Sequence, residues 1–140
     1  GPEAGGASHL CYIKPGSGAT YSDAGGLIPL SESILEHHIK KFKAGGTVVS
    51  EADEAECREA RHILTLGPAA ILGARRVVQS IVDADTAPAK RESYRQLLDT
   101  EFAADADTRE QQLDQNPGLW LRLHPNVRSL ILQNVLETGT

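Results

Sequence analysis

The chain has few of the residues that stabilise very small or membrane-embedded proteins. Its 140 residues include two cysteines, Cys11 and Cys57, and no methionine. Two cysteines do not make a disulfide framework, and a domain of this length can bury a core without one. No apolar run approaches the roughly 20 residues of a membrane span, and the N-terminal part lacks the order of a signal peptide. These absences predict a soluble, cytoplasmic protein with free thiols and no membrane contact.

Aromatic and basic side chains are also scarce. Aromatic residues make up 4% of the chain and apolar residues 40%, so the core is expected to consist of Leu, Ile, Val and Ala, which favours helices. The 14 basic residues are outnumbered by 19 acidic ones, giving a net charge of -5. This balance disfavours nucleic-acid binding, because the chain as a whole repels a phosphate backbone. The start Gly1-Pro2 is typical of a processed fragment, so the first residues are excluded from the fold prediction.

Glycine is concentrated at the N-terminal end, where residues 1–26 hold seven of the 13 glycines. This density argues against a helix in the segment. Two short runs that favour β-structure, residues 9–13 and 19–22, flank the turn residues Lys14-Pro15-Gly16-Ser17-Gly18. The pattern predicts a small β-hairpin.

Helix signals begin at Ser31, which is placed to cap a helix over residues 32–44 that ends at Gly45-Gly46. Ser50 and Asp53 have the spacing of a capping box, which predicts a second helix continuing to Gly67. Pro68 suits the first turn of a third helix, and an apolar stripe over residues 70–82 predicts that it continues to about residue 83. Further helical segments are predicted after a Thr86 cap, at residues 109–115, at 119–123 and at 127–137.

The predicted fold class is therefore mainly α: a helical bundle of five to six helices with a small N-terminal β-hairpin. The predicted organisation is a glycine-rich segment over residues 1–26 and a helical domain over residues 27–140.

The histidines and cysteines do not have the spacing of a metal site. Cys57 and His62 are five residues apart, so they diverge on a helix, and the common ligand spacings are absent. Cys11 lies in a predicted strand, without the helix N-terminus or neighbouring cation that would activate a thiol nucleophile. We therefore predict no metal, no cofactor and no assigned catalytic residue.

One dense basic run, from His37 to Lys43, leaves an alternative open. His37, His38 and Lys40 are residue types that perform acid-base chemistry on phosphodiesters without a metal. This would suit a small effector-type or toxin-type enzyme acting on a nucleotide or phosphodiester. The competing interpretation is a solvated helix end whose lysines compensate the helix dipole.

Apolar residues are in excess near the carboxyl end. Leu119, Trp120 and Leu121 are consecutive and so cannot all face one core from a helix. An exposed Trp with a neighbouring Arg is typical of a binding hot spot, whereas a buried Trp would fill the end of the core. We predict a protein–protein interaction module (an adaptor, docking or assembly domain) that binds another protein or itself. Its predicted partner-binding residues are Leu119, Trp120, Leu121, Arg122, Leu132 and Leu136.

Overall fold

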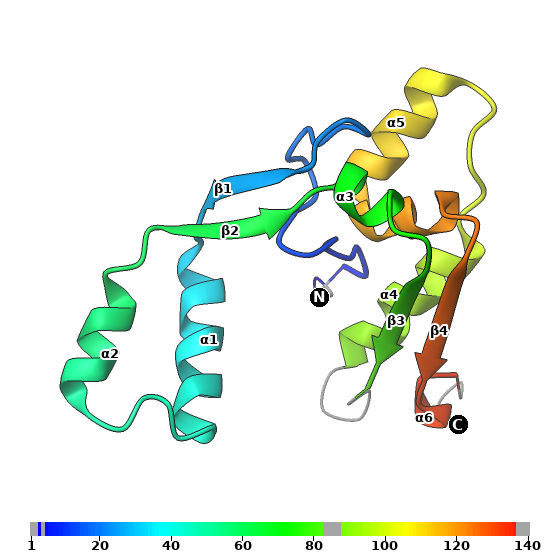
Figure 1. The fold of residues 1–140 in the computed structure, drawn as a ribbon. Helices are drawn as coiled ribbons and strands as arrows, with labels where there is room; N and C mark the ends of the chain where they lie inside the picture. Colours follow the sequence, from blue (N-terminus) through cyan, green and yellow to red (C-terminus); the bar gives the residue numbers. More distant parts are fainter. Residues whose placement is uncertain (1–2, 4, 83–87, 137–140) are drawn as a thin grey trace. The chain divides into compact units, whose positions relative to one another are not determined.

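The computed structural model describes residues 3, 5–82 and 88–136. The chain divides into two compact units: unit 1 combines Gly1–Gly25 with Leu66–Thr140, and unit 2 is Gly26–Thr65. Within the described residues there are seven helices and two sheets of two strands each (Figure 1). The protein therefore belongs to the α+β class, and the prediction of a helical bundle was wrong.

Unit 2 contains the two helices whose ends the sequence marks most clearly. Helix α1 (Glu32–Ala44) begins where Ser31 Oγ accepts a hydrogen bond from Ile34 N, and it is followed by Gly45 and by Gly46 at φ +75°. Helix α2 (Glu51–Arg58) begins with the predicted capping box, in which Ser50 Oγ accepts from Asp53 N and Asp53 Oδ2 accepts from Ser50 N. The start and end predicted for α1 and the start predicted for α2 are confirmed.

Ion pairs join the exposed surfaces of α1 and α2. Lys43 Nζ lies 2.5 Å from Glu54 Oε2, and Arg58 pairs with both Glu36 and Glu54. Ile39 and Val48 are buried apolar side chains of this unit. The ion pairs link the two helices at the surface, where such pairs contribute little to stability.

The predicted second helix is too long, because residues 62–66 form a strand. Strands β1 (Gly25–Pro29) and β2 (His62–Leu66) pair, and the hydrogen bonds from Leu30 N to Arg61 O and from Gly67 N to Ala24 O show that they are antiparallel. Along β2, Ile63 and Thr65 are more buried than their neighbours. This period of two is the strand pattern, but a segment of five residues is too short to distinguish a strand from a helix by sequence.

The core of unit 1 brings the N-terminal segment against later elements. Leu10, Ile13, Leu97, Leu113, Leu119 and Trp120 are its buried members. The segment is fastened by Asn116, whose Oδ1 accepts hydrogen bonds from Ser8 N at 2.9 Å and Ser8 Oγ at 3.0 Å. A small N-terminal hairpin exists, but its turn is not the predicted one at residues 14–18. Leu10 pairs with Ile13 across Cys11 and Tyr12, inside the predicted first strand, and Cys11 has a φ of 51°.

The predicted third helix and the predicted last helix are each replaced by a short helix and a strand. Helix α3 (Pro68–Leu72) stops at Gly73, and strand β3 (Val77–Ile81) follows. Strand β4 (Val127–Ile131) pairs with β3 in parallel, with Val77 opposite Val127 and Ile81 opposite Ile131, and helix α6 (Gln133–Leu136) follows it. β-Branched residues at the ends of both strands pack well on a pleated surface and lose side-chain freedom in a helix, which explains the outcome.

The remaining elements connect β3 to β4. Helix α4 (Pro88–Asp99) has Pro88 in its first turn as predicted, whereas the predicted Thr86 cap lies outside the described residues. Helix α5 (Ala106–Gln115) is capped by Asp105, and the 3-10 helix η1 (Pro117–Leu123) follows it. None of the helices within residues 5–82 and 88–136 is long and apolar enough to cross a bilayer.

Candidate functional site

Buried polar contacts fix the amino ends of β3 and β4. The ring of His124, which is buried, contacts Ala74 O through Nε2 at 2.6 Å and accepts from Asn126 N through Nδ1 at 2.9 Å. Because Nδ1 accepts a hydrogen bond, Nε2 carries the proton and donates to Ala74 O. Asn126 Nδ2 also donates to Arg75 O at 3.2 Å. These hydrogen bonds therefore fix the amino ends of β3 and β4 in addition to the main-chain hydrogen bonds between the two strands.

The hydrogen bonds of this ladder determine which main-chain groups of β4 remain open. Val77 N donates to Asn126 O, and Leu132 N donates to Ile81 O. In a parallel pair, alternate residues direct both main-chain groups toward the neighbouring strand. Arg128 and Leu130 therefore face β3, whereas the N–H and C=O groups of Val127, Ser129 and Ile131 point away from it. Residues 5–82 and 88–136 place no hydrogen-bond partner on these outward groups.

The outer edge of β4 is more open than the outer edge of β3. At the end of β3, Lys90 Nζ donates to Val82 O at 2.8 Å, so one outward carbonyl is already occupied by a charged side chain. Lysine at a strand edge is a known obstacle to further pairing. Figure 1 shows β3 and β4 side by side, with β4 on the outer side. We therefore identify the edge of β4 as the candidate site.

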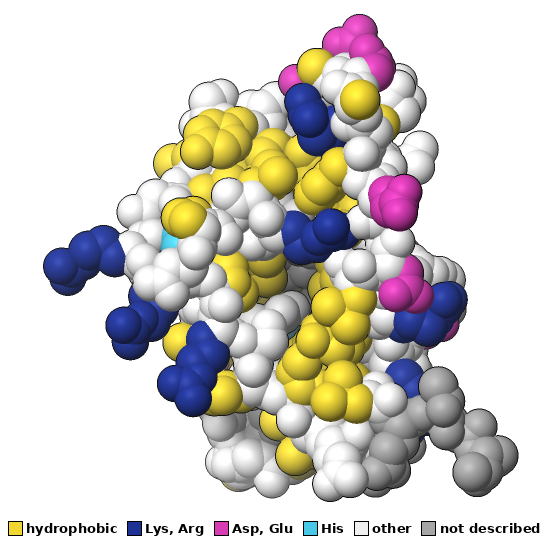
Figure 2. Space-filling model, turned by 90° about the vertical axis from the view of Figure 1, so that its right-hand side faces the viewer, with side chains coloured by type: hydrophobic (Ala, Val, Ile, Leu, Met, Phe, Trp, Pro, Cys, Tyr) yellow, Lys and Arg dark blue, Asp and Glu magenta, His cyan; other side chains and the backbone are white. Residues whose placement is uncertain are grey.

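Apolar side chains border this edge. Val78 is 57% exposed and Leu130 is 49% exposed, although both belong to strands of the sheet. Leu132 and Val82, which directly follow the strands, are also exposed. Figure 2 shows the molecule from the side on which β4 lies in Figure 1, with hydrophobic side chains gathered in the middle of the face. A two-stranded sheet with an exposed apolar face is a small folding unit that gains stability from a further strand.

Three arginines give the amino end of the sheet a positive charge. Arg75 and Arg76 directly precede β3, and Arg128 is the second residue of β4. The pairing of Val77 with Val127 places all three at the same end. All three are exposed, and no carboxylate in the described part of the chain forms an ion pair with them. Figure 2 shows Lys and Arg side chains projecting at the left border of this face.

The residues predicted to bind a partner are divided between the core and the surface. Leu119 and Trp120 are 1% and 6% exposed, so they fill the core of unit 1, and the ring of Tyr21 lies 6.1 Å from that of Trp120. Leu121 packs at the margin of the core, and the Arg122 guanidinium lies 4.8 Å from the centre of the Phe102 ring. Leu132 and Leu136 are exposed, at 45% and 58%.

The predicted helix over residues 127–137 would leave no open main-chain groups on one edge, so the sequence does not predict this site. The available signal was the presence of β-branched residues at both ends of a five-residue run.

The residues of the alternative enzyme prediction lie on α1 in unit 2. His37 and Lys40 are exposed, whereas His38 is half-buried with its ring stacked on Phe42, 5.9 Å between centroids. The His37 and His38 rings contact each other edge to face at 5.9 Å. Stacking on Phe42 gives His38 a packing role, and the lysines of the last turn compensate the helix dipole.

The cysteines and possible metal ligands do not form a second site. Cys11 and Cys57 are free thiols, as predicted. Partial burial raises the pKa of the Cys11 thiol, which lowers the thiolate fraction at neutral pH and makes Cys11 a poorer nucleophile. Within residues 5–82 and 88–136, no three side chains of His, Cys, Asp or Glu converge as a metal site requires.

Comparisons of the chain with protein-family models, with curated proteins and with solved structures found no match.

Proposed function

We propose that this protein is a protein–protein interaction module that binds an extended segment of a partner protein along the outer edge of β4. In this mode the partner contributes a strand, and main-chain hydrogen bonds provide much of the affinity. The single observation that carries the proposal is the open edge of β4, where the outward groups of Val127, Ser129 and Ile131 have no hydrogen-bond partner in the described residues.

The side chains around the edge indicate the chemistry of the bound segment. Its alternate residues would be apolar, so that they cover Leu130 and the neighbouring Leu132, which are exposed. Acidic residues at one end would meet Arg128, Arg75 and Arg76, which have no carboxylate partner in the described residues. The module would therefore select an acidic, alternating segment rather than any exposed strand.

The proposed surface is centred on the edge of β4, whereas the surface predicted from the sequence includes Leu119 and Trp120. Leu132 and Leu136 remain part of it, because they are exposed next to β4. Leu119 and Trp120 do not take part, because they are buried in unit 1. We also propose a cytoplasmic location for the module, which the free thiols Cys11 and Cys57 support.

The proposal can be tested by selecting short peptides from a random display library on the immobilised protein and measuring their affinity. The selected peptides should alternate apolar residues and carry acidic ones. Ser129→Pro should weaken their binding at least about tenfold, because the variant lacks a main-chain donor and its ring blocks the added strand. The fold should persist, because the Ser129 N–H does not bond to β3.

Three control variants show whether binding depends on the open edge of β4. Ser129→Ala removes the side chain but not the N–H, so it should bind like the unaltered protein. Ser80→Pro introduces the same ring at the outer edge of β3 and should leave the affinity unchanged. Arg128→Glu should weaken the binding of acidic peptides. Equal affinity for Ser129→Pro and Ser129→Ala would refute the proposed mode. A dimer that Ser129→Pro dissociates would instead show that a second copy occupies the edge.

A further inference from the structure

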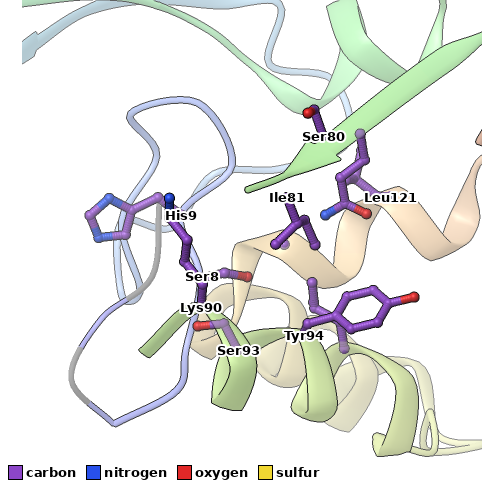
Figure 3. Close-up of a pocket in the computed structure, with 11 residues that line it drawn as sticks. Ser8, His9, Ser80, Ile81, Lys90, Ser93, Tyr94 and Leu121 are labelled. Carbon is purple, nitrogen blue, oxygen red and sulfur yellow. The ribbon is translucent and has the colours of Figure 1, made fainter. Parts of the chain in front are cut away.

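Unit 1 also contains a pocket that the proposed interaction does not use. Its volume is about 160 Å³, and it lies between the N-terminal segment, the second half of β3, α4 and η1. Figure 3 shows Ser93 and Tyr94 on α4 below Ile81 of β3, with Ser8 beside them. The pocket thus lies near the carboxyl end of β3.

A buried hydroxyl in this pocket has no hydrogen-bond partner among the described residues. Ser93 is 5% exposed, and its Oγ forms no hydrogen bond with any residue in the described part of the chain. An unpaired buried polar group is costly, and native proteins usually pair such groups with protein, water or ligand. The Ser8 hydroxyl, which also lines the pocket, is already bonded to Asn116 Oδ1. Of the two buried serine hydroxyls that line the pocket, Ser93 is therefore the one that is available to a ligand.

A positively charged side chain, that of Lys90, lines the same pocket. Lys90 precedes Ser93 by three residues on α4, so the two side chains share one face of the helix. Lys90 Nζ bonds to the Val82 carbonyl, and no carboxylate in the described part of the chain pairs with it. His9 also lines the pocket, but its ring is paired with Glu3 at 2.7 Å and points away from the other labelled side chains in Figure 3. Among the described residues, Lys90 is therefore the lysine of the pocket that has no carboxylate partner.

The rest of the lining includes the apolar side chains of Ile81, Leu97 and Leu121, together with Gln79, Ser80, Tyr94 and Gly118. A cavity of about 150 Å³ accommodates a molecule of the size of benzene, so this pocket matches a single ring or a short branched chain. The ring or chain of such a ligand would cover the apolar side chains, and one anionic group of the ligand would reach Lys90 and Ser93.

We infer that the pocket binds a small organic carboxylate. The carboxylate accepts hydrogen bonds from Lys90 Nζ and Ser93 Oγ, and its apolar body lies against Ile81, Leu97 and Leu121. This binding does not depend on the open edge of β4.

Benzoate is a suitable probe, with benzyl alcohol and benzylamine as matched controls that keep the ring and change the charge. Binding is measured by isothermal titration and by NMR shifts of the Ser93, Tyr94 and Leu97 amides. Benzoate should bind and shift these amides, and benzylamine should not. Lys90→Met should reduce benzoate affinity at least about tenfold, because a charge-assisted hydrogen bond is lost, and should leave benzyl alcohol affinity unchanged.

Ser93→Ala gives a second, independent result. It removes a buried hydroxyl that is unpaired in the free protein, so the free variant should be at least as stable as the unaltered protein, while benzoate affinity falls several-fold. Ser129→Pro should leave benzoate affinity unchanged, which separates this site from the proposed interaction surface. Failure of benzoate to bind at its solubility limit, or equal binding by Lys90→Met, would overturn the inference.

Discussion

The close packing of Gly118 against the N-terminal segment makes a quantitative prediction about unit 1. A Cβ added at Gly118 would lie 1.9 Å from Ser8 Oγ and 3.1 Å from both Ser8 Cβ and Leu97 Cδ2. Ser8 Oγ cannot move away without losing its 3.0 Å hydrogen bond to Asn116 Oδ1. Gly118→Ala should therefore separate the N-terminal segment from η1 or strain both.

The expected magnitude combines two costs. Overpacking a buried site costs about 1–3 kcal/mol, and loss of the Ser8 Oγ hydrogen bond costs about 1 kcal/mol. We therefore expect Gly118→Ala to reduce the free energy of unfolding by about 2–4 kcal/mol. In a Ser8→Gly background both Ser8 atoms are absent, so the same substitution should cost less than about 1 kcal/mol. The coupling free energy between the two sites should be about 2 kcal/mol.

The assay is urea unfolding followed by the fluorescence of Trp120, which is the only tryptophan of the chain and lies in the core of unit 1. Its signal therefore reports on unit 1. The four proteins of the double-mutant cycle are compared by linear extrapolation. An equal cost of Gly118→Ala with and without Ser8→Gly would show that the close approach to Ser8 is not what limits residue 118.

Two further predictions concern the core and the charged surface of α1 and α2. Trp120→Ala should destabilise the protein by about 3–5 kcal/mol because Trp120 is a core residue, whereas Leu136→Ala should change stability by less than about 0.5 kcal/mol; comparable small effects in urea unfolding would contradict this assignment. Hydrogen bonds from Arg58 lower the pKa of Glu36, and hydrogen bonds from Lys43 and Arg58 lower that of Glu54. The stability that these carboxylates contribute is therefore present above their ordinary pKa of 4.5 and is lost as the pH falls through the lowered values of the folded state. Arg58→Gln should flatten the decline in thermal stability between about pH 5 and pH 3, measured by circular dichroism; an unchanged pH profile would show that Arg58 does not stabilise the ionised carboxylates.

The parts of the fold that could be predicted from sequence are those marked by local chemistry. Ser31, Gly45-Gly46 and the Ser50–Asp53 capping box act on main-chain groups within a few residues of themselves, so their effect does not depend on the rest of the chain. The same is true of Pro88 in the first turn of α4. Helix α5 begins at Ala106, three residues before the predicted segment 109–115.

The strands could not be predicted in the same way, because their pairing is non-local. β3 and β4 are separated by 45 intervening residues, yet each is stabilised by hydrogen bonds to the other. A five-residue segment such as Val77–Ile81, with apolar residues at 77, 78 and 81, fits a helical stripe and a strand equally well. Val77, Val78 and Ile81 are β-branched, which was the available local indication of a strand.

The candidate sites depend on this non-local pairing and on burial. The open groups of Ser129 exist only because its neighbours Arg128 and Leu130 are committed to β3. In the same way, the unpaired state of Ser93 Oγ follows from the packing of α4 in unit 1 and has no signature in the sequence. Trp120 is the opposite case. A Trp next to an Arg is typical of a binding residue, but the burial of Trp120 assigns it to the core.

Amide hydrogen exchange along β4, measured by NMR with and without a selected peptide, tests the proposed interaction most directly. In the free protein the amides of Arg128, Leu130 and Leu132 should exchange slowly because they donate to β3, and those of Val127, Ser129 and Ile131 should exchange rapidly. Addition of the peptide should slow exchange at Val127, Ser129 and Ile131. Exchange at these three amides that is slow in the free protein, or that the bound peptide leaves unchanged, would contradict strand addition at β4.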